Sequence, residues 1–184
     1  MGNFSRRIKS TFSSQRKVWQ LFAASVGAEY VDNGMFKPAV ITKKFDGGEL
    51  VLDSYSKMKG RAHVTYTRFQ TQCVNPNNLQ FRIDRKTFLN SKAPKGLEKA
   101  ITEYEDFDRL FRLFVLQKRE IKRLLNRRIL RDIAMQQPFR DLRIELVENN
   151  LVLRITPLNK DLIQLKSLFK LMETLRDQFN TGFQ

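Results

Sequence analysis

Two hairpin signals constrain the fold of this chain more than any other feature. Each is a short run of turn-forming residues between two segments rich in strand-forming side chains. Glycine and asparagine favour the tight turns that join antiparallel strands, so each signal predicts a hairpin. The two turns are Asp46-Gly47-Gly48-Glu49, between segments 39–45 and 50–55, and Asn149-Asn150, between segments 142–146 and 151–155.

The turn at Asn149-Asn150 also predicts a register. With two residues in the turn, Glu145 lies opposite Arg154, which makes a favourable cross-strand pair. Leucine and isoleucine then alternate along both strands and share one face of the hairpin. Further segments with strand character are 61–74, 79–83 and 110–115.

Helical patterns separate these strands. We expect a helix from about Ser13 to Gly27, a short helix opened by Pro94, a basic helix from Lys118 to Ala134, and a C-terminal helix capped near Asn159. The predicted fold class is α+β: an antiparallel β-sheet of about six to seven strands with helices packed mainly on one face. The expected organisation is a basic N-terminal arm over residues 1–17 and a single α+β domain over residues 18–184.

The net charge of +15, from 34 basic and 19 acidic residues, is unevenly spread. Residues 1–28 carry five bases and no acid, and residues 109–143 carry eleven bases and three acids. A basic excess of this size favours a polyanionic partner, such as nucleic acid or anionic lipid, or an acidic protein surface. The lone Cys73 fits a reducing compartment, so a cytoplasmic location, with membrane association as an option, is expected.

The basic helix carries a ridge of arginines. Four-residue spacing drifts by only about 40° per step on a helix, so such residues form one row, in which neighbouring charges repel by roughly 0.2–0.5 kcal/mol. We call this row the Arg ridge: Arg119, Arg123, Arg127 and Arg131. Its leading interpretation is a partner-binding face of a non-catalytic interaction module. Its alternatives are a solvated surface and pairing with the acids at 103–108. Lys118 and Lys122 fall near the apolar side of the same helix, so we expect the helix to fray, to begin later than Lys118, or to be interrupted at Asn126.

The N-terminal arm supports a second hypothesis, peripheral association with a membrane surface. Apolar residues recur every fourth position beside a group of bases, as in helices that lie in a headgroup layer. The residues concerned are Phe4, Arg6, Arg7, Ile8, Lys9, Phe12, Arg16 and Lys17. The alternative for the following turns is that Trp19 and Phe22 dock on the sheet. No run of about 18 apolar residues occurs, so no transmembrane segment is expected.

Catalytic and cofactor signatures were sought, and none was found. His63 and Cys73 lie too far apart along one expected strand to form a nucleophilic pair. Asp106 and Asp108 are the candidates for a metal-assisted hydrolase, with pairing to arginines as the alternative. No catalytic, cofactor-binding or metal-binding residue is therefore assigned, no cofactor is expected, and enzyme activity is left open, leaning towards none.

Nucleic-acid motifs are also absent, although nucleic acid stays a possible partner through charge alone. Aromatic and basic residues alternate in segments 79–88 and 107–114. A sheet that stacks bases on these rings is one interpretation. The other, which we favour, is that most of these aromatic side chains form the core.

From Trp19 onward the chain resembles a family of small bacterial α+β proteins with no assigned activity. The resemblance rests on residues that are explained equally well by packing or capping, so it implies a single domain of this length and no catalytic role. These residues are Trp19 with Gly27, Thr67-Arg68, Phe107-Asp108 with Phe111, Arg127-Arg128-Ile129 leading to Gln137-Pro138, and Asp161 with Leu165, Leu168 and Phe169.

Overall fold

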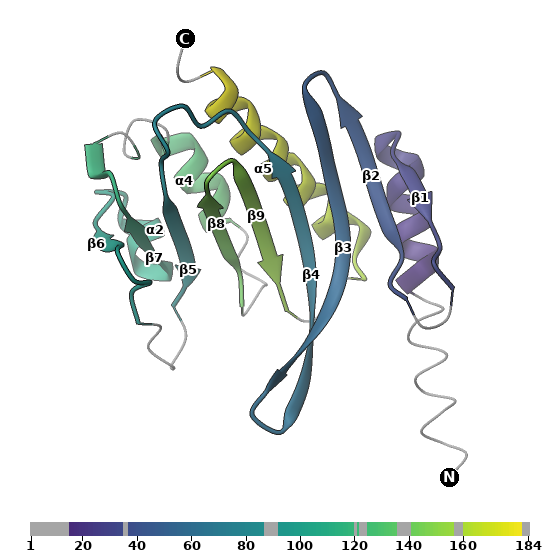
Figure 1. Ribbon diagram of the computed structural model, residues 1–184. Helices are drawn as coiled ribbons and strands as arrows, with labels where there is room; N and C mark the ends of the chain where they lie inside the picture. The colour runs from purple at the N-terminus through teal and green to yellow at the C-terminus, as the bar shows by residue number, and fades with distance from the viewer. Residues whose placement is uncertain are drawn as a thin grey trace.

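A nine-stranded antiparallel sheet dominates the computed structural model (Figure 1). The structure describes residues 15–34, 37–86, 92–119, 121, 125–135, 141–156 and 160–181, with the side chains of residues 59 and 127 outside that description. The strands are β1 Glu29–Val31, β2 Val40–Phe45, β3 Gly48–Lys59, β4 Ala62–Gln72, β5 Phe81–Arg85, β6 Glu98–Ala100, β7 Phe111–Val115, β8 Arg143–Val147 and β9 Asn150–Ile155. Their order in the sheet is β1-β2-β3-β4-β9-β8-β5-β7-β6.

The α+β class and the antiparallel sheet are confirmed, but the expected six to seven strands were too few. The two additional strands, β1 and β6, have three residues each and lie at the two edges of the sheet. Strand β6 also replaces the short helix expected after Pro94, because Glu98 and Ala100 pair with Val115 and Leu113 of β7. Pairing across the sheet outweighs the weak local helix preference there.

The described helices lie on one face of this sheet (Figure 1). They are a first helix at residues 15–26, α2 Glu105–Leu110, α4 Arg127–Ala134 and α5 Leu162–Thr181. Sheet and helices share a single hydrophobic cluster. One row of it crosses six adjacent strands, and each of its side chains is at most 1% exposed: Leu52, Phe69, Leu153, Ile144, Ile83 and Leu113.

The first helix packs its aromatic residues into this cluster. Trp19 and Phe22 are fully buried, and the Phe22 ring meets that of Phe169 edge-on at 5.5 Å. The helix ends at Gly27, whose positive φ of 61° suits glycine, and the Ala28 N–H donates to the Ala23 carbonyl at 2.9 Å. Trp19 and Phe22 therefore belong to the core, which confirms the alternative that these two residues dock on the sheet.

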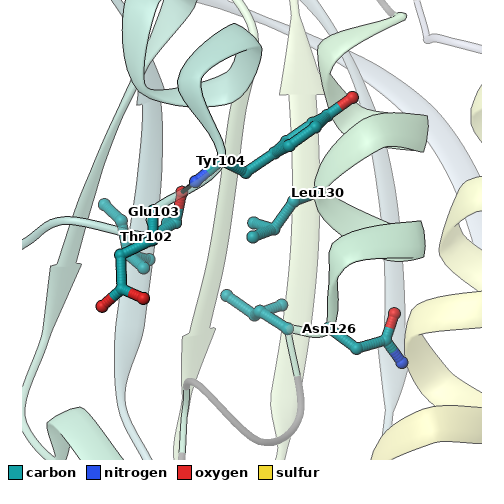
Figure 2. Close-up of a pocket in the computed structure, with 7 residues that line it drawn as sticks. Thr102, Glu103, Tyr104, Asn126 and Leu130 are labelled. Carbon is teal, nitrogen blue, oxygen red and sulfur yellow. Dashed lines mark hydrogen bonds between the residues drawn. The ribbon is translucent and has the colours of Figure 1, made fainter.

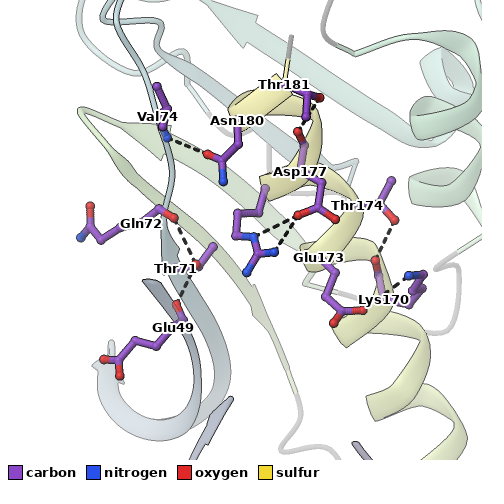
Figure 3. A network of polar contacts seen from close by, with 11 residues as sticks. Glu49, Thr71, Gln72, Val74, Lys170, Glu173, Thr174, Asp177, Asn180 and Thr181 are labelled. Atoms are coloured by element: carbon purple, nitrogen blue, oxygen red, sulfur yellow. Dashed lines mark hydrogen bonds and ion pairs between the residues drawn. The ribbon is translucent and has the colours of Figure 1, made fainter. Parts of the chain in front are cut away.

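Helix α5 is held at both ends. Its start is capped by Asp161, two residues after the expected Asn159, through hydrogen bonds from Ile163 N and Gln164 N at 2.8 and 3.1 Å. Near its end, Asn180 accepts a 2.8 Å hydrogen bond from Val74 N, which ties the helix to the chain leaving β4 (Figure 3).

The register of the β8–β9 hairpin differs from the prediction. Glu148, with φ 55°, and Asn149 form the turn, so Glu145 lies opposite Val152 and Arg154 opposite Arg143. The expected Glu145–Arg154 partners remain diagonal neighbours, with 4.0 Å between their charged atoms. Both registers keep the same leucines and isoleucines on the buried face, so the apolar pattern alone does not distinguish them.

Candidate interaction surface

The basic helix expected over residues 118–134 is interrupted. Asn126 has an extended backbone, with ψ 168°, and its side chain caps α4 by accepting from Ile129 N at 3.1 Å. The helical residues 118, 119 and 121 therefore belong to a separate segment. The expectation of one continuous helix is therefore wrong, and the interruption at Asn126, one of the options from the sequence, is confirmed. The geometric basis for a straight Arg ridge is lost with the continuous helix.

The ridge residues lie on both sides of this break. Arg119 and Arg131 are exposed, and the Arg131 Nε lies 4.0 Å from the Asp132 carboxylate. Arg123 and the side chain of Arg127 fall outside the described residues. The apolar side of the segment is confirmed, because Ile121, Leu125, Ile129 and Ile133 are all buried.

Most of the N-terminal arm also lies outside the description: Phe4, Arg6, Arg7, Ile8, Lys9 and Phe12. Arg16 and Lys17, by contrast, belong to the first helix. Arg16 pairs with Asp32 at 3.3 Å and donates to the Gly34 carbonyl, whereas Lys17 is exposed. Arg16 therefore helps to hold the first helix against the chain that follows β1.

Asp106 and Asp108, the candidates for a metal-assisted hydrolase, both make local contacts. The Asp108 carboxylate accepts from Thr102 N and Glu103 N at 3.1 and 3.2 Å, and Asp106 pairs with Arg109 at 3.1 Å. Among the described residues that line a nearby cavity of about 410 Å³, Glu103 is the one with a carboxylate (Figure 2). Within the described ranges no three His, Cys, Asp or Glu side chains gather as metal ligands.

His63 and Cys73 are separated as expected. His63 is exposed on the outer part of β4, whereas Cys73 is buried after the end of that strand. Burial raises the pKa of the Cys73 thiol to about 11, so it is a poor nucleophile near neutral pH. No helix in the described part of the chain is both long and apolar enough to cross a bilayer.

A row of charged residues crosses the opposite face of the sheet. Each member is the sequence neighbour of a residue in the buried row, so its side chain points away from the helices. The described helices do not cover this side (Figure 1). We call it the arginine row, and in sheet order it reads Asp53, Arg68, Arg154, Arg143, Asp84 and Arg112.

Carboxylates pair with the row's arginines on both sides of Arg154. Asp53 forms a fork with Arg68, through Nε at 2.9 Å and through Nη2, and the same hydrogen bond raises the pKa of Arg68. Asp84, only 4% exposed, accepts from Arg82 Nε at 2.7 Å and from Arg143 Nε. Planar guanidinium groups suit this double contact with carboxylates.

Arg154, in the middle of the row, lies farther from its carboxylate partner than Arg68 and Arg143 lie from theirs. It lies between Arg68 and Arg143, and like charges directly opposite each other are unfavourable. Burial lowers its pKa, but a hydrogen bond to Tyr55 and the charge of Glu145, 4.0 Å away, raise it above the ordinary value. Arg154 thus stays charged while its closest carboxylate is beyond hydrogen-bond length.

Aromatic rings on this face are engaged by their neighbours. Tyr55 and Tyr66 stack at 5.3 Å, with the Arg68 guanidinium 5.2 Å from the Tyr55 ring centre. Arg82 lies 5.6 Å from the ring centre of Phe114. Three aromatic side chains of segments 79–88 and 107–114 are in the core, as the interpretation that we favoured predicts: Phe81, Phe107 and Phe111.

The sequence did not point to the arginine row. Only the Glu145–Arg154 contact was expected, and from a different register. The neighbours in the row are 11 to 86 residues apart in the sequence, and they are brought together by a strand order that local patterns do not specify. The sequence signal that could have found this row is a charged residue directly next to an apolar core residue in each of these strands.

Comparison with known proteins shows the fold. No protein-family model and no curated protein matches the chain. The crystal structure of the mycobacterial trehalose monomycolate transport factor A superposes with a TM-score of 0.60, covering 91% of this chain and 93% of that one. The two proteins share a fold. At 11% sequence identity the likeness extends to the fold alone.

Proposed function

We propose that the protein is a non-catalytic interaction module that binds an acidic protein partner through the arginine row. This keeps the class of function suggested by the sequence but moves the contact from the Arg ridge to the open face of the sheet. The observation that supports it is the run of Arg68, Arg154 and Arg143 on three adjacent strands. A partner carboxylate near Arg154 would relieve the repulsion within that run.

Several features favour an acidic protein over nucleic acid. The face includes the carboxylates of Asp53, Asp84 and Glu145, which would repel a phosphate backbone but suit a partner of mixed charge. Tyr55 and Tyr66 already stack on each other, so their rings offer less area for stacking bases. The arginines are partly buried and held by their own ion pairs, which reduces the entropy lost on binding.

Titration of the full chain with polyglutamate at rising salt concentration tests the proposal. Arg154→Gln should weaken binding at least about tenfold, because a hydrogen bond to a charged group contributes roughly 1.5–3 kcal/mol. The matched control is Arg131→Gln, which removes one arginine from the Arg ridge and should leave the affinity unchanged. Heparin and an RNA oligonucleotide, titrated in parallel, separate an acidic protein partner from a polyanion in general.

Two results would contradict the proposal. A loss of affinity in Arg131→Gln without one in Arg154→Gln would return the binding function to the helix. An absence of salt-sensitive binding to polyglutamate, heparin and RNA alike would reject an anionic partner altogether.

A further inference from the structure

The β3–β4 hairpin extends beyond the rest of the sheet. Strand β2 pairs with β3 as far as Leu52, and β9 pairs with β4 as far as Thr67. From Tyr55↔Tyr66 to Lys59↔Ala62, the two strands have no other strand partner among the described residues. These five pairs, at about 3.4 Å per residue, make a projection of roughly 17 Å, which reaches the bottom of Figure 1.

Specific contacts stabilise this projection, since a two-stranded hairpin without a core is marginal in water. Tyr55 and Tyr66 stack at its base, with their rings 17° from parallel. The hydroxyls of Ser56 and Thr65 form a 2.9 Å hydrogen bond one pair further out. The hairpin is therefore held in a defined direction although its outer part contributes nothing to the buried core.

The tip combines one apolar side chain with several cations. Met58 is 61% exposed, and Lys57 and Arg61 beside it are exposed as well. The sequence has no acid between Asp53 and Asp84, so no carboxylate of the hairpin itself neutralises the tip. An exposed apolar side chain between cations is a combination that the interface of an anionic bilayer accommodates.

The chain enters the fold beside this hairpin. A cavity of about 290 Å³ is lined by Gln15, Arg16 and Trp19 of the first helix and by Ser56 and Thr65 of the hairpin, among others. Gln15, where the described part of the chain begins, therefore lies at the hairpin end of the sheet.

We propose that the hairpin end of the molecule docks on an anionic lipid bilayer. Met58 enters the headgroup layer, and Lys57 and Arg61 contact the anionic headgroups. A nucleic acid would account for the cations but leave the exposed Met58 without a role. This surface is separate from the arginine row, so it stands independently of the function proposed above.

Vesicle sedimentation with the full chain tests the inference. The probes are phosphatidylcholine vesicles with and without one-third phosphatidylglycerol. The variant Lys57→Glu with Arg61→Glu should reduce partitioning to the anionic vesicles about 30-fold or more, because each base near such a surface contributes about a fivefold gain. The matched control, Lys95→Glu with Lys99→Glu, makes the same charge change near β6, at the far edge of the sheet, and should change partitioning less than threefold.

A second measurement reports insertion directly and does not depend on net charge. Met58→Cys carries an environment-sensitive fluorophore, and the buried Cys73, with its raised pKa, stays unlabelled at neutral pH. Anionic vesicles should shift the emission to the blue, as expected for transfer into a less polar layer. Thermal unfolding of each variant, expected to match that of the parent chain, verifies that the exposed substitutions leave the fold intact.

Three outcomes would overturn the inference. One is an equal loss of partitioning in the hairpin variant and the β6 control. Another is an unchanged emission of the labelled hairpin on vesicles that do bind the protein. The third is hairpin-dependent binding to duplex RNA or DNA with no binding to anionic vesicles, which would assign this end to nucleic acid.

Discussion

Asp84 should contribute more to stability than any exposed ion pair of this protein. Its carboxylate lies between Arg82 and Arg143 and is the shared acceptor for both. Asp84→Ala removes this acceptor from both guanidinium groups, and Arg143 then faces Arg154 with only Glu145, 4.0 Å from Arg154, to offset the repulsion. Asp84 itself is 4% exposed, so the pairing is shielded from solvent.

The size of the effect follows from this burial. Removing one partner of a buried ion pair costs about 3–5 kcal/mol. The side chains of Arg82 and Arg143 are 16% and 27% exposed, so water can hydrate them in part once the carboxylate is gone. The expected loss of stability therefore lies at the lower end of this range. About 3 kcal/mol corresponds to a fall in Tm of about 6–12 °C for a chain of this size.

Calorimetry and urea unfolding of Asp84→Ala measure this loss. The matched control is Asp106→Ala, which breaks the pair with Arg109, both partners of which are at least 60% exposed, and should cost less than about 1 kcal/mol. Asp84→Asn, which keeps one acceptor oxygen, should fall between them. If Asp84→Ala were no more destabilising than Asp106→Ala, the arginine row would not depend on its carboxylates and the reasoning would fail.

Three further predictions concern the cap, the thiol and the core. Asn126→Ala should lower the free energy of unfolding by about 1 kcal/mol through loss of the α4 cap, and Asn126→Asp should restore it, as measured by urea titration. The pKa of Cys73 is raised from 9.0 to about 11 in the fold, so the free energy of unfolding should decline as pH rises across that interval, and Cys73→Ala should flatten the decline. Phe179→Ala, which removes the 5.8 Å stack on Phe81, should cost about 3–5 kcal/mol by the same titration, whereas an effect below about 1 kcal/mol would mean that the helix repacks.

Local patterns were sufficient for the class of the fold and for most of its elements. Alternation at Phe81 and Ile83 predicts a half-buried strand, and β5 has both side chains in the core. The turn at Asp46-Gly47 lies where glycine was expected to allow it, with φ 82° at Gly47. These predictions succeeded for the same reason: residues close in sequence determine where a turn forms and which face of a strand is buried.

The features that the sequence did not predict depend on contacts between residues far apart in the chain. Strand β6 exists because β7 offers it an edge, not because residues 98–100 favour a strand. The break at Asn126, by contrast, comes from a local capping contact with Ile129 and was one of the options that the sequence offered. The arginine row required the positions of β4, β9, β8 and β5 in the sheet, which no pattern within one strand contains.

The strand order has a consequence for synthesis of the chain. Strands β4 and β5 follow each other in sequence but are separated in the sheet by β9 and β8, which are made last but for α5. Until residues 143–155 leave the ribosome, the nascent chain can form two part-sheets whose inner edges, β4 and β5, expose unpaired backbone groups. Unpaired edges of this kind associate with other chains. We therefore expect C-terminal truncations before residue 143 to aggregate, and the β8–β9 hairpin supplied as a peptide in trans to reduce that aggregation by closing the gap.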